Sequence, residues 1–253
     1  MTLADIDGLI WLGLALLPFI WAQRRLHYEL QAVLLLIFRQ PALSLGIFSF
    51  LFLPGVLLHE ASHFFAARLL FVPIGRFSLT PKVLSNGTLR LGYLETGKVD
   101  FIRDALIGTA PLVVGGVMVG LIGATRLGLV EVGSAVGENA PAAVLESLHA
   151  LPSLPDFWLW FYLAFTISST MMPSASDRRA WLPVVLVFGA ATALALMTGA
   201  GPWLVENASP VINNFLRAVA LIFAISLGFH MLLLPTLFFI RRLLNHVTGL
   251  AVQ

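Results

Sequence analysis

The hydrophobic positions of this chain fall into long apolar runs that end at charged residues, prolines or glycines. A helix needs about 20 mostly apolar residues to cross the hydrocarbon core of a bilayer. The runs predict six membrane-spanning helices, at about 8–22, 42–71, 103–125, 156–172, 180–199 and 215–240. We therefore expect an all-α polytopic membrane protein.

The stretch between the first two predicted spans has a different pattern. It opens with Arg24 and Arg25, and its apolar tail at 32–38 is too short to cross a membrane. We interpret residues 23–41 as an interfacial segment that ends at Pro41.

A second change of pattern follows the second predicted span. Asn86-Gly87 lies between short runs of β-prone residues at 83–93, which is typical of a β-hairpin. A hairpin next to a site in the membrane could supply an edge strand for an extended peptide, and a surface hairpin without a role is the alternative. The candidate substrate-binding residues are Asn86, Gly87, Leu89 and Leu91.

Composition supports the membrane interpretation. The 253 residues are 58% hydrophobic and only 11% charged, with a mean hydropathy of +0.92, which is too apolar for a soluble domain. The formal charge of +2 and the lack of a basic module argue against a nucleic-acid partner. Because the chain has no cysteine, any metal must be held by histidine and carboxylate. No repeat or soluble segment divides residues 1–253, so we expect one membrane domain.

Basic residues give an expected orientation. Those at 68–103, Arg178-Arg179 and Arg241-Arg242 fall on one face of the six-span arrangement, which the positive-inside rule makes cytoplasmic. Both termini would then be cytoplasmic. Arg24, Arg25 and Arg39 disagree with the rule, because this arrangement places them on the opposite face.

The second predicted span contains His59-Glu60-Ala61-Ser62-His63, an H-E-x-x-H motif. Positions i and i+4 of a helix lie about 40° apart around its axis, so both imidazoles can reach one metal ion. Glu60 lies beside them, where a carboxylate can take a proton from metal-bound water. Ionisable groups at membrane depth cost about 2.5–3.5 kcal/mol each on insertion scales, which favours a functional site.

A catalytic zinc usually has three protein ligands and one open position, so two histidines are not enough. Asp177 follows the fourth predicted span on the side of the motif, in a segment broken by Pro173. Its alternative role is a helix cap or a partner of Arg178 or Arg179. His230 in the sixth predicted span is the rival ligand.

With these residues the chain resembles the site-2 protease family of intramembrane zinc metalloproteases. The resemblance covers about residues 42–182 and rests on the motif helix, the hairpin-like segment, Ala110-Pro111-Leu112, Pro173 and Asp177. It implies a metalloprotease core at 42–182, flanked by an N-terminal part at 1–41 and C-terminal spans at 183–253. In that core His59, His63 and Asp177 would hold Zn²⁺, with Glu60 as the general base. Ser176-Asp177-Arg178 stands where the family has Leu-Asp-Gly, and Thr109-Ala110-Pro111 where it often has Ala-Gly-Pro.

The resulting hypothesis is a zinc metalloendopeptidase that hydrolyses peptide bonds of membrane-spanning substrates. We expect a multi-pass protein of a prokaryotic cell membrane, with its active site toward the cytoplasmic face. Its partners would be the lipid bilayer, a membrane-protein substrate, and either a second copy or a regulatory membrane protein. The alternative is a metal-binding membrane protein without proteolysis, either a pseudoprotease or a zinc carrier.

Overall fold

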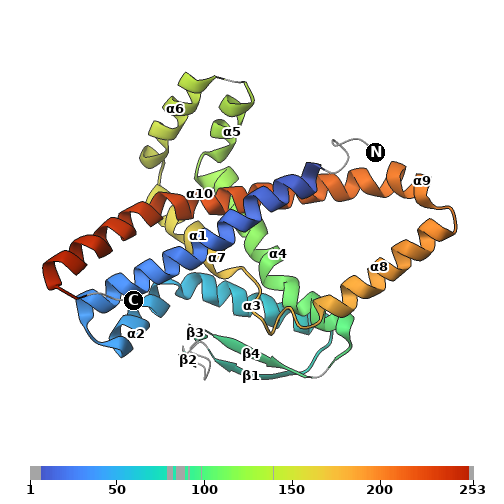
Figure 1. Cartoon of the computed structure of the whole chain (residues 1–253), viewed down its shortest axis with the longest axis horizontal. Coiled ribbons are helices and arrows are strands. Elements are labelled where there is room, and N and C mark those ends of the chain that lie inside the picture. Colours follow the sequence, from blue (N-terminus) through green and yellow to red (C-terminus); the bar gives the residue numbers. More distant parts are fainter. Residues whose placement is uncertain are drawn as a thin grey trace.

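The computed structural model of the chain describes residues 7–78, 82–83, 89–90, 92–97, 99–138 and 140–250, which are almost entirely helical. Figure 1 shows α1 and α10 side by side along the long axis, with the strands next to α3 and with α5 and α6 projecting from the opposite side. The predicted all-α class is confirmed. The elements are α1 Asp7–Phe38, α2 Pro41–Leu51, α3 Leu53–Leu69, β1 Ile74–Ser78, β2 Lys82–Val83, β3 Leu89–Arg90, β4 Tyr93–Thr96, α4 Phe101–Arg126, α5 Leu129–Gly137, α6 Pro141–Ala150, a 3₁₀ turn Leu151–Ser153, α7 Phe157–Thr170, α8 Trp181–Met197, α9 Gly201–Trp203, a π-helical turn Leu204–Ala208 and α10 Ser209–Thr248.

The described helices supply fewer spans than the six that the sequence predicts. Three helical stretches are long and apolar enough to cross a membrane: α1, α4 and the continuous stretch Gly201–Thr248. The pair α2 and α3 makes a fourth if it is one span, broken by a bend of 66°. The 14 residues of α7 extend only about 21 Å, short of a bilayer core of about 30 Å. The chain is thus a candidate membrane protein with three or four such spans among its described residues.

The predicted interfacial segment at 23–41 is not a separate helix. The α1 helix continues without a break to Phe38, over 32 residues. Its polar positions do not end it because they have partners: Gln23 donates to the Ser169 carbonyl, and Glu29 pairs with Arg241 of α10. The end of the first helix that charge predicted was therefore wrong. These polar residues have partners on neighbouring helices, so α1 continues through them.

The helices α1 and α10 run in the same direction. Asp7 pairs with Arg217 near the start of both helices, and Glu29 pairs with Arg241 near the end of both. Arg24-Arg25 consequently lie toward the same end of this pair as Arg241-Arg242. The prediction that these two basic groups face opposite sides of the membrane is wrong, because it required α1 to end before residue 23.

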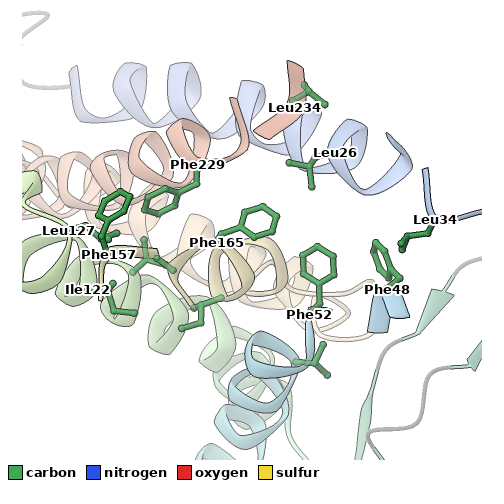
Figure 2. Packing of buried hydrophobic residues seen from close by; sticks show 14 residues of the cluster. Leu26, Leu34, Phe48, Phe52, Ile122, Leu127, Phe157, Phe165, Phe229 and Leu234 are labelled. Carbon is green, nitrogen blue, oxygen red and sulfur yellow. The ribbon is translucent and has the colours of Figure 1, made fainter. Parts of the chain in front are cut away.

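One large apolar cluster joins α1, α2, α3, α4, α7 and α10. Figure 2 shows the rings of Phe52, Phe165 and Phe229 between the ribbons of these helices, with Leu26 of α1 above them. All four side chains are buried. This cluster packs against the first turns of α3 and along α7, the helices that carry the two motif histidines and Thr170.

The β-prone segment forms two short antiparallel strand pairs. Phe77 of β1 lies opposite Leu94 of β4, and Val83 of β2 lies opposite Leu89 of β3. Of the predicted substrate-binding residues, only Leu89 is described; Asn86, Gly87 and Leu91 lie outside the described residues. The predicted Asn86-Gly87 turn is therefore untested.

Candidate metal centre

The two motif histidines lie on α3 with their Nε2 atoms 3.2 Å apart. The position of α3 beside α7 depends on Gly55, where a Cβ atom would lie 2.3 Å from the Thr166 carbonyl oxygen. Only glycine permits this approach of backbone to backbone. One turn further along both helices, this close approach places His59 next to Thr170.

A backbone carbonyl orients each imidazole. His59 Nδ1 lies 2.7 Å from the Thr170 oxygen, and His63 Nδ1 lies 2.9 Å from the Ile107 oxygen. A carbonyl oxygen can only accept a hydrogen bond, so both Nδ1 atoms carry the proton. In the neutral rings, Nε2 is then left with a lone pair. The same device orients metal-ligating histidines generally.

These two carbonyls are available for a local reason. An α-helical carbonyl normally accepts from the N–H four residues later. Four residues after Ile107 is Pro111, which has no N–H. Thr170 is the last residue of α7, and the N–H of Ser174 four residues later is donated instead to Asp177 Oδ2, at 2.7 Å.

Asp177 faces both histidines from the segment between α7 and α8. Its Oδ2 lies 3.8 Å from His59 Nε2, and its Oδ1 lies 3.5 Å from His63 Nε2. The structure thus brings together the three predicted ligands from α3 and from a segment more than a hundred residues later. The predicted capping role is not observed, because Asp177 accepts from the amide of Ser174, three residues before it, and the N-cap of α8 is Ala180.

Two contacts with α4 hold the Asp177 segment in place. A Cβ atom at Gly108 would lie 2.0 Å from the Asp177 carbonyl oxygen, so this position has no room for a larger residue. One turn earlier, Asp104 accepts two hydrogen bonds from Arg179, each 2.7 Å long. Arg179 therefore pairs with Asp104, leaving the Asp177 carboxylate directed at the imidazoles.

The electrostatics of the cluster require a positive charge. Burial favours the neutral form of the Asp177 carboxyl, but His59, His63 and the Ser174 amide favour the carboxylate more strongly. The pKa of Asp177 consequently lies well below its usual range. A carboxylate and two Nε2 lone pairs then converge on one point, and such acceptors repel one another unless a proton or a cation lies between them.

The spacing of the three groups fits a metal ion. Two atoms bound tetrahedrally to one zinc at about 2.0–2.1 Å lie about 3.3–3.4 Å apart. The observed separations of 3.2, 3.5 and 3.8 Å bracket this value. His59, His63 and Asp177 could therefore hold a metal ion.

Glu60 is buried beside the histidines, with only 5% of its surface exposed. Gly92, which precedes β4, lies against it: a Cβ atom there would be 3.0 Å from Glu60 Oε1 and 3.2 Å from a methyl group of Val56. The strand segment thus covers the carboxylate that the motif predicts as a base. This contact places β4 next to the candidate site.

The rival ligand His230 lies elsewhere, fully buried in the helical core. Its Nδ1 lies 2.7 Å from the Ser226 carbonyl oxygen, and its Nε2 lies 2.9 Å from Ser169 Oγ. Both nitrogens are therefore used in hydrogen bonds. His230 is a packing residue in this structure.

Sequence reasoning missed the groups that orient the predicted ligands. Thr170 contributes only its backbone, so its residue type gives no signal. Pro111 did give one, because a proline inside a helix releases the carbonyl four residues earlier, and Gly108 lies in the same turn. Comparison with known proteins adds no further information: no family model, curated protein or solved structure matches the chain.

Proposed function

We propose that this protein is an intramembrane zinc metalloprotease that hydrolyses peptide bonds of membrane-spanning substrates. The observation that carries the proposal is the convergence of His59, His63 and Asp177, with both histidine Nδ1 atoms held by backbone carbonyls. A site used only to carry metal would not need the carboxylate of Glu60 beside the two imidazoles. The resemblance to site-2 proteases points to the same chemistry.

Two imidazoles and one carboxylate make up a donor set typical of catalytic zinc. Zinc, when bound, supplies Lewis acidity that activates water and polarises a carbonyl group. Thr170 and Ile107 hold the two imidazoles so that their Nε2 lone pairs would face a bound ion. Asp177 completes the set, and a cation held among the three groups would favour its carboxylate form.

Glu60 acts as the general base in this proposal. It accepts a proton from the attacking water and later passes it to the amine that leaves. Its burial under Gly92 excludes bulk water, which strengthens electrostatic interactions at the carboxylate. The side chains of His59 and Asp177 are 13% and 15% exposed, so the centre is partly accessible.

A substrate helix must unwind locally before cleavage, because its carbonyl groups are otherwise engaged in its own hydrogen bonds. Within the described residues, β4 pairs with β1 alone. Strand addition to this sheet would hold an unwound segment through main-chain hydrogen bonds, as it does elsewhere. The contact between Gly92 and Glu60 would bring such a segment to the base.

The test combines metal analysis with cleavage. Wild type, Asp177→Ala and Glu60→Gln are purified under zinc-replete conditions and reconstituted in liposomes with a panel of single-span model substrates. We expect about one zinc per chain in wild type and in Glu60→Gln, and marked loss in Asp177→Ala. Cleavage should occur in wild type and fall at least about 100-fold in Glu60→Gln, since general-base catalysis contributes factors of that size.

Two results would count against the proposal in different ways. Equal cleavage by Glu60→Gln and wild type would remove the assigned role of Glu60. Stoichiometric zinc without cleavage of any substrate would favour the non-proteolytic alternative, a pseudoprotease or a zinc carrier.

A further inference from the structure

The helices α1 and α10 run side by side (Figure 1), and each carries two consecutive arginines near the point where Glu29 of α1 pairs with Arg241 of α10. Arg24 and Arg25 come from α1, and Arg241 and Arg242 come from consecutive positions of α10. The link between the two groups is Glu29, which is fully buried and pairs with both Arg25 and Arg241. Glu29 is thus the counter-ion of two of the four arginines, and the group keeps an excess of positive charge.

Two of these arginines are left without a counter-ion. Arg24 is exposed and has no carboxylate partner among the described residues. Arg242 is also exposed and lies over the ring of Phe238, 5.2 Å from its centre, again without a carboxylate within the described part of the chain. Guanidinium groups that are exposed and free of carboxylates can bind a phosphate group through two hydrogen bonds.

The surface beside them changes from apolar to cationic along α1. A depression there is lined by Leu17, Ile20, Trp21, Arg24, Arg25 and Tyr28. Leu17 and Trp21 are 69% and 57% exposed, so the apolar part faces outward. The Tyr28 ring lies under both Arg25 and Arg241, at 5.1 and 5.8 Å from the guanidinium carbons. Tryptophan and tyrosine are enriched where a membrane protein meets the headgroup layer.

We propose that this end of the α1–α10 pair is a binding site for an anionic phospholipid. Arg24 contacts the phosphate, while Arg25 and, from the neighbouring helix, Arg242 add positive potential. Leu17, Ile20 and Trp21 contact the first part of an acyl chain. The order of Leu17 and Ile20, then Trp21, then Arg24 along α1 matches the order of acyl chain, interface and phosphate along a phospholipid. Basic pockets between membrane helices bind anionic headgroups by this charge complementarity.

Thermal unfolding in a non-ionic detergent tests this site without reference to metal or catalysis. A ligand that binds only the folded state raises the midpoint of unfolding, by an amount that grows with the logarithm of the ligand concentration once this exceeds the dissociation constant. We expect phosphatidylglycerol to raise the midpoint, and phosphatidylcholine or inorganic phosphate at the same concentration to leave it unchanged. In the double variant Arg24→Gln/Arg242→Gln, the phosphatidylglycerol concentration needed for the same rise should increase roughly tenfold or more, given the usual contribution of each arginine near an anionic headgroup.

Arg126→Gln is the matched control, since Arg126 is also an exposed arginine over an aromatic ring, that of Trp160, at the end of an apolar helix. It should respond to phosphatidylglycerol as wild type does. Four results would overturn the proposal: equal protection by phosphatidylcholine, equal protection by inorganic phosphate, an unchanged response in the double variant, or the same loss in Arg126→Gln. The midpoints of all variants without lipid show whether the fold itself is preserved.

Discussion

The candidate metal centre and the His230 site use the same side chain in opposite ways. In both places an imidazole Nδ1 donates to a backbone carbonyl. At His230 the carbonyl is that of Ser226, on the same helix, and Nε2 meets the hydroxyl group of Ser169. At His59 the carbonyl belongs to another helix, and Nε2 faces a second imidazole and a carboxylate.

The difference lies in what faces the second nitrogen. A hydroxyl group can donate to Nε2, so the His230 pair is satisfied without any ion. Carboxylate and imidazole lone pairs cannot satisfy one another, so the His59–His63–Asp177 group needs a cation or a proton. A buried histidine in a helical membrane protein is therefore identified as a ligand by the groups that converge on its free nitrogen. Burial does not distinguish the two sites.

Among substitutions that test this contrast between the two histidine sites, Gly108→Ala is expected to have the largest effect on metal binding. The new methyl group cannot lie 2.0 Å from the Asp177 carbonyl oxygen, so the Asp177 segment must move away from α4 and from both histidines. We expect the purified protein to lose most of its bound zinc, measured as metal per chain after dialysis.

Gly120→Ala is the control for Gly108→Ala, because Gly120 lies on the same helix with nothing within 4 Å of the position that a Cβ would take. It should retain zinc as wild type does. Alanine is also favoured over glycine inside a helix by about 0.5–1 kcal/mol. Full zinc in Gly108→Ala would show that Asp177 does not complete the centre.

A smaller effect on the metal is expected from Pro111→Ala. Alanine supplies an N–H that competes for the Ile107 carbonyl, so His63 loses the acceptor that orients it. We expect zinc affinity to fall about 10- to 100-fold, as for other groups that orient metal ligands. Titration with a competing chelator measures the affinity.

Pro111→Ala is informative because its two effects have opposite signs. Replacing a proline in a helix interior restores a backbone hydrogen bond, so α4 itself should not be destabilised. Unfolding of the metal-free variant, compared with that of the metal-free wild type, checks this. If affinity were unchanged, the orientation of His63 would not depend on the carbonyl that Pro111 releases.

The smallest effect on bound metal is expected from a change at His230, the second histidine site of this comparison. His230→Ala removes two buried hydrogen bonds and the ring contacts with Phe19 and Phe165. We expect a loss of roughly 2 kcal/mol in the free energy of unfolding, with the zinc content unchanged. His246→Ala, at an exposed position of the same helix, should change neither quantity. Loss of zinc in His230→Ala but not in His246→Ala would mean that the two histidine sites are coupled.

Predictions from sequence were best where the signal was local. The spacing of His59 and His63 on one helix follows from helical geometry, and the apolar runs follow from composition. Six spans were not confirmed, because α7 and α8 are short and α2–α3 is bent. The end of the first helix was wrong, because it depended on whether Arg24, Arg25 and Glu29 had partners in space. The structure supplies one in Arg241, which no local pattern could indicate.

The sequence by itself determined the class of fold and placed two histidines and a carboxylate on one helix, since both depend on residues within a few turns of each other. Only the tertiary structure decided between Asp177 and His230 as the third group, because that choice depends on the packing of α4 and α7 against α3. Close approaches at Gly55 and Gly108, and carbonyls released at Ile107 and Thr170, produce that packing. Backbone groups have no residue-specific signature, so their role appears only when the helices are in contact.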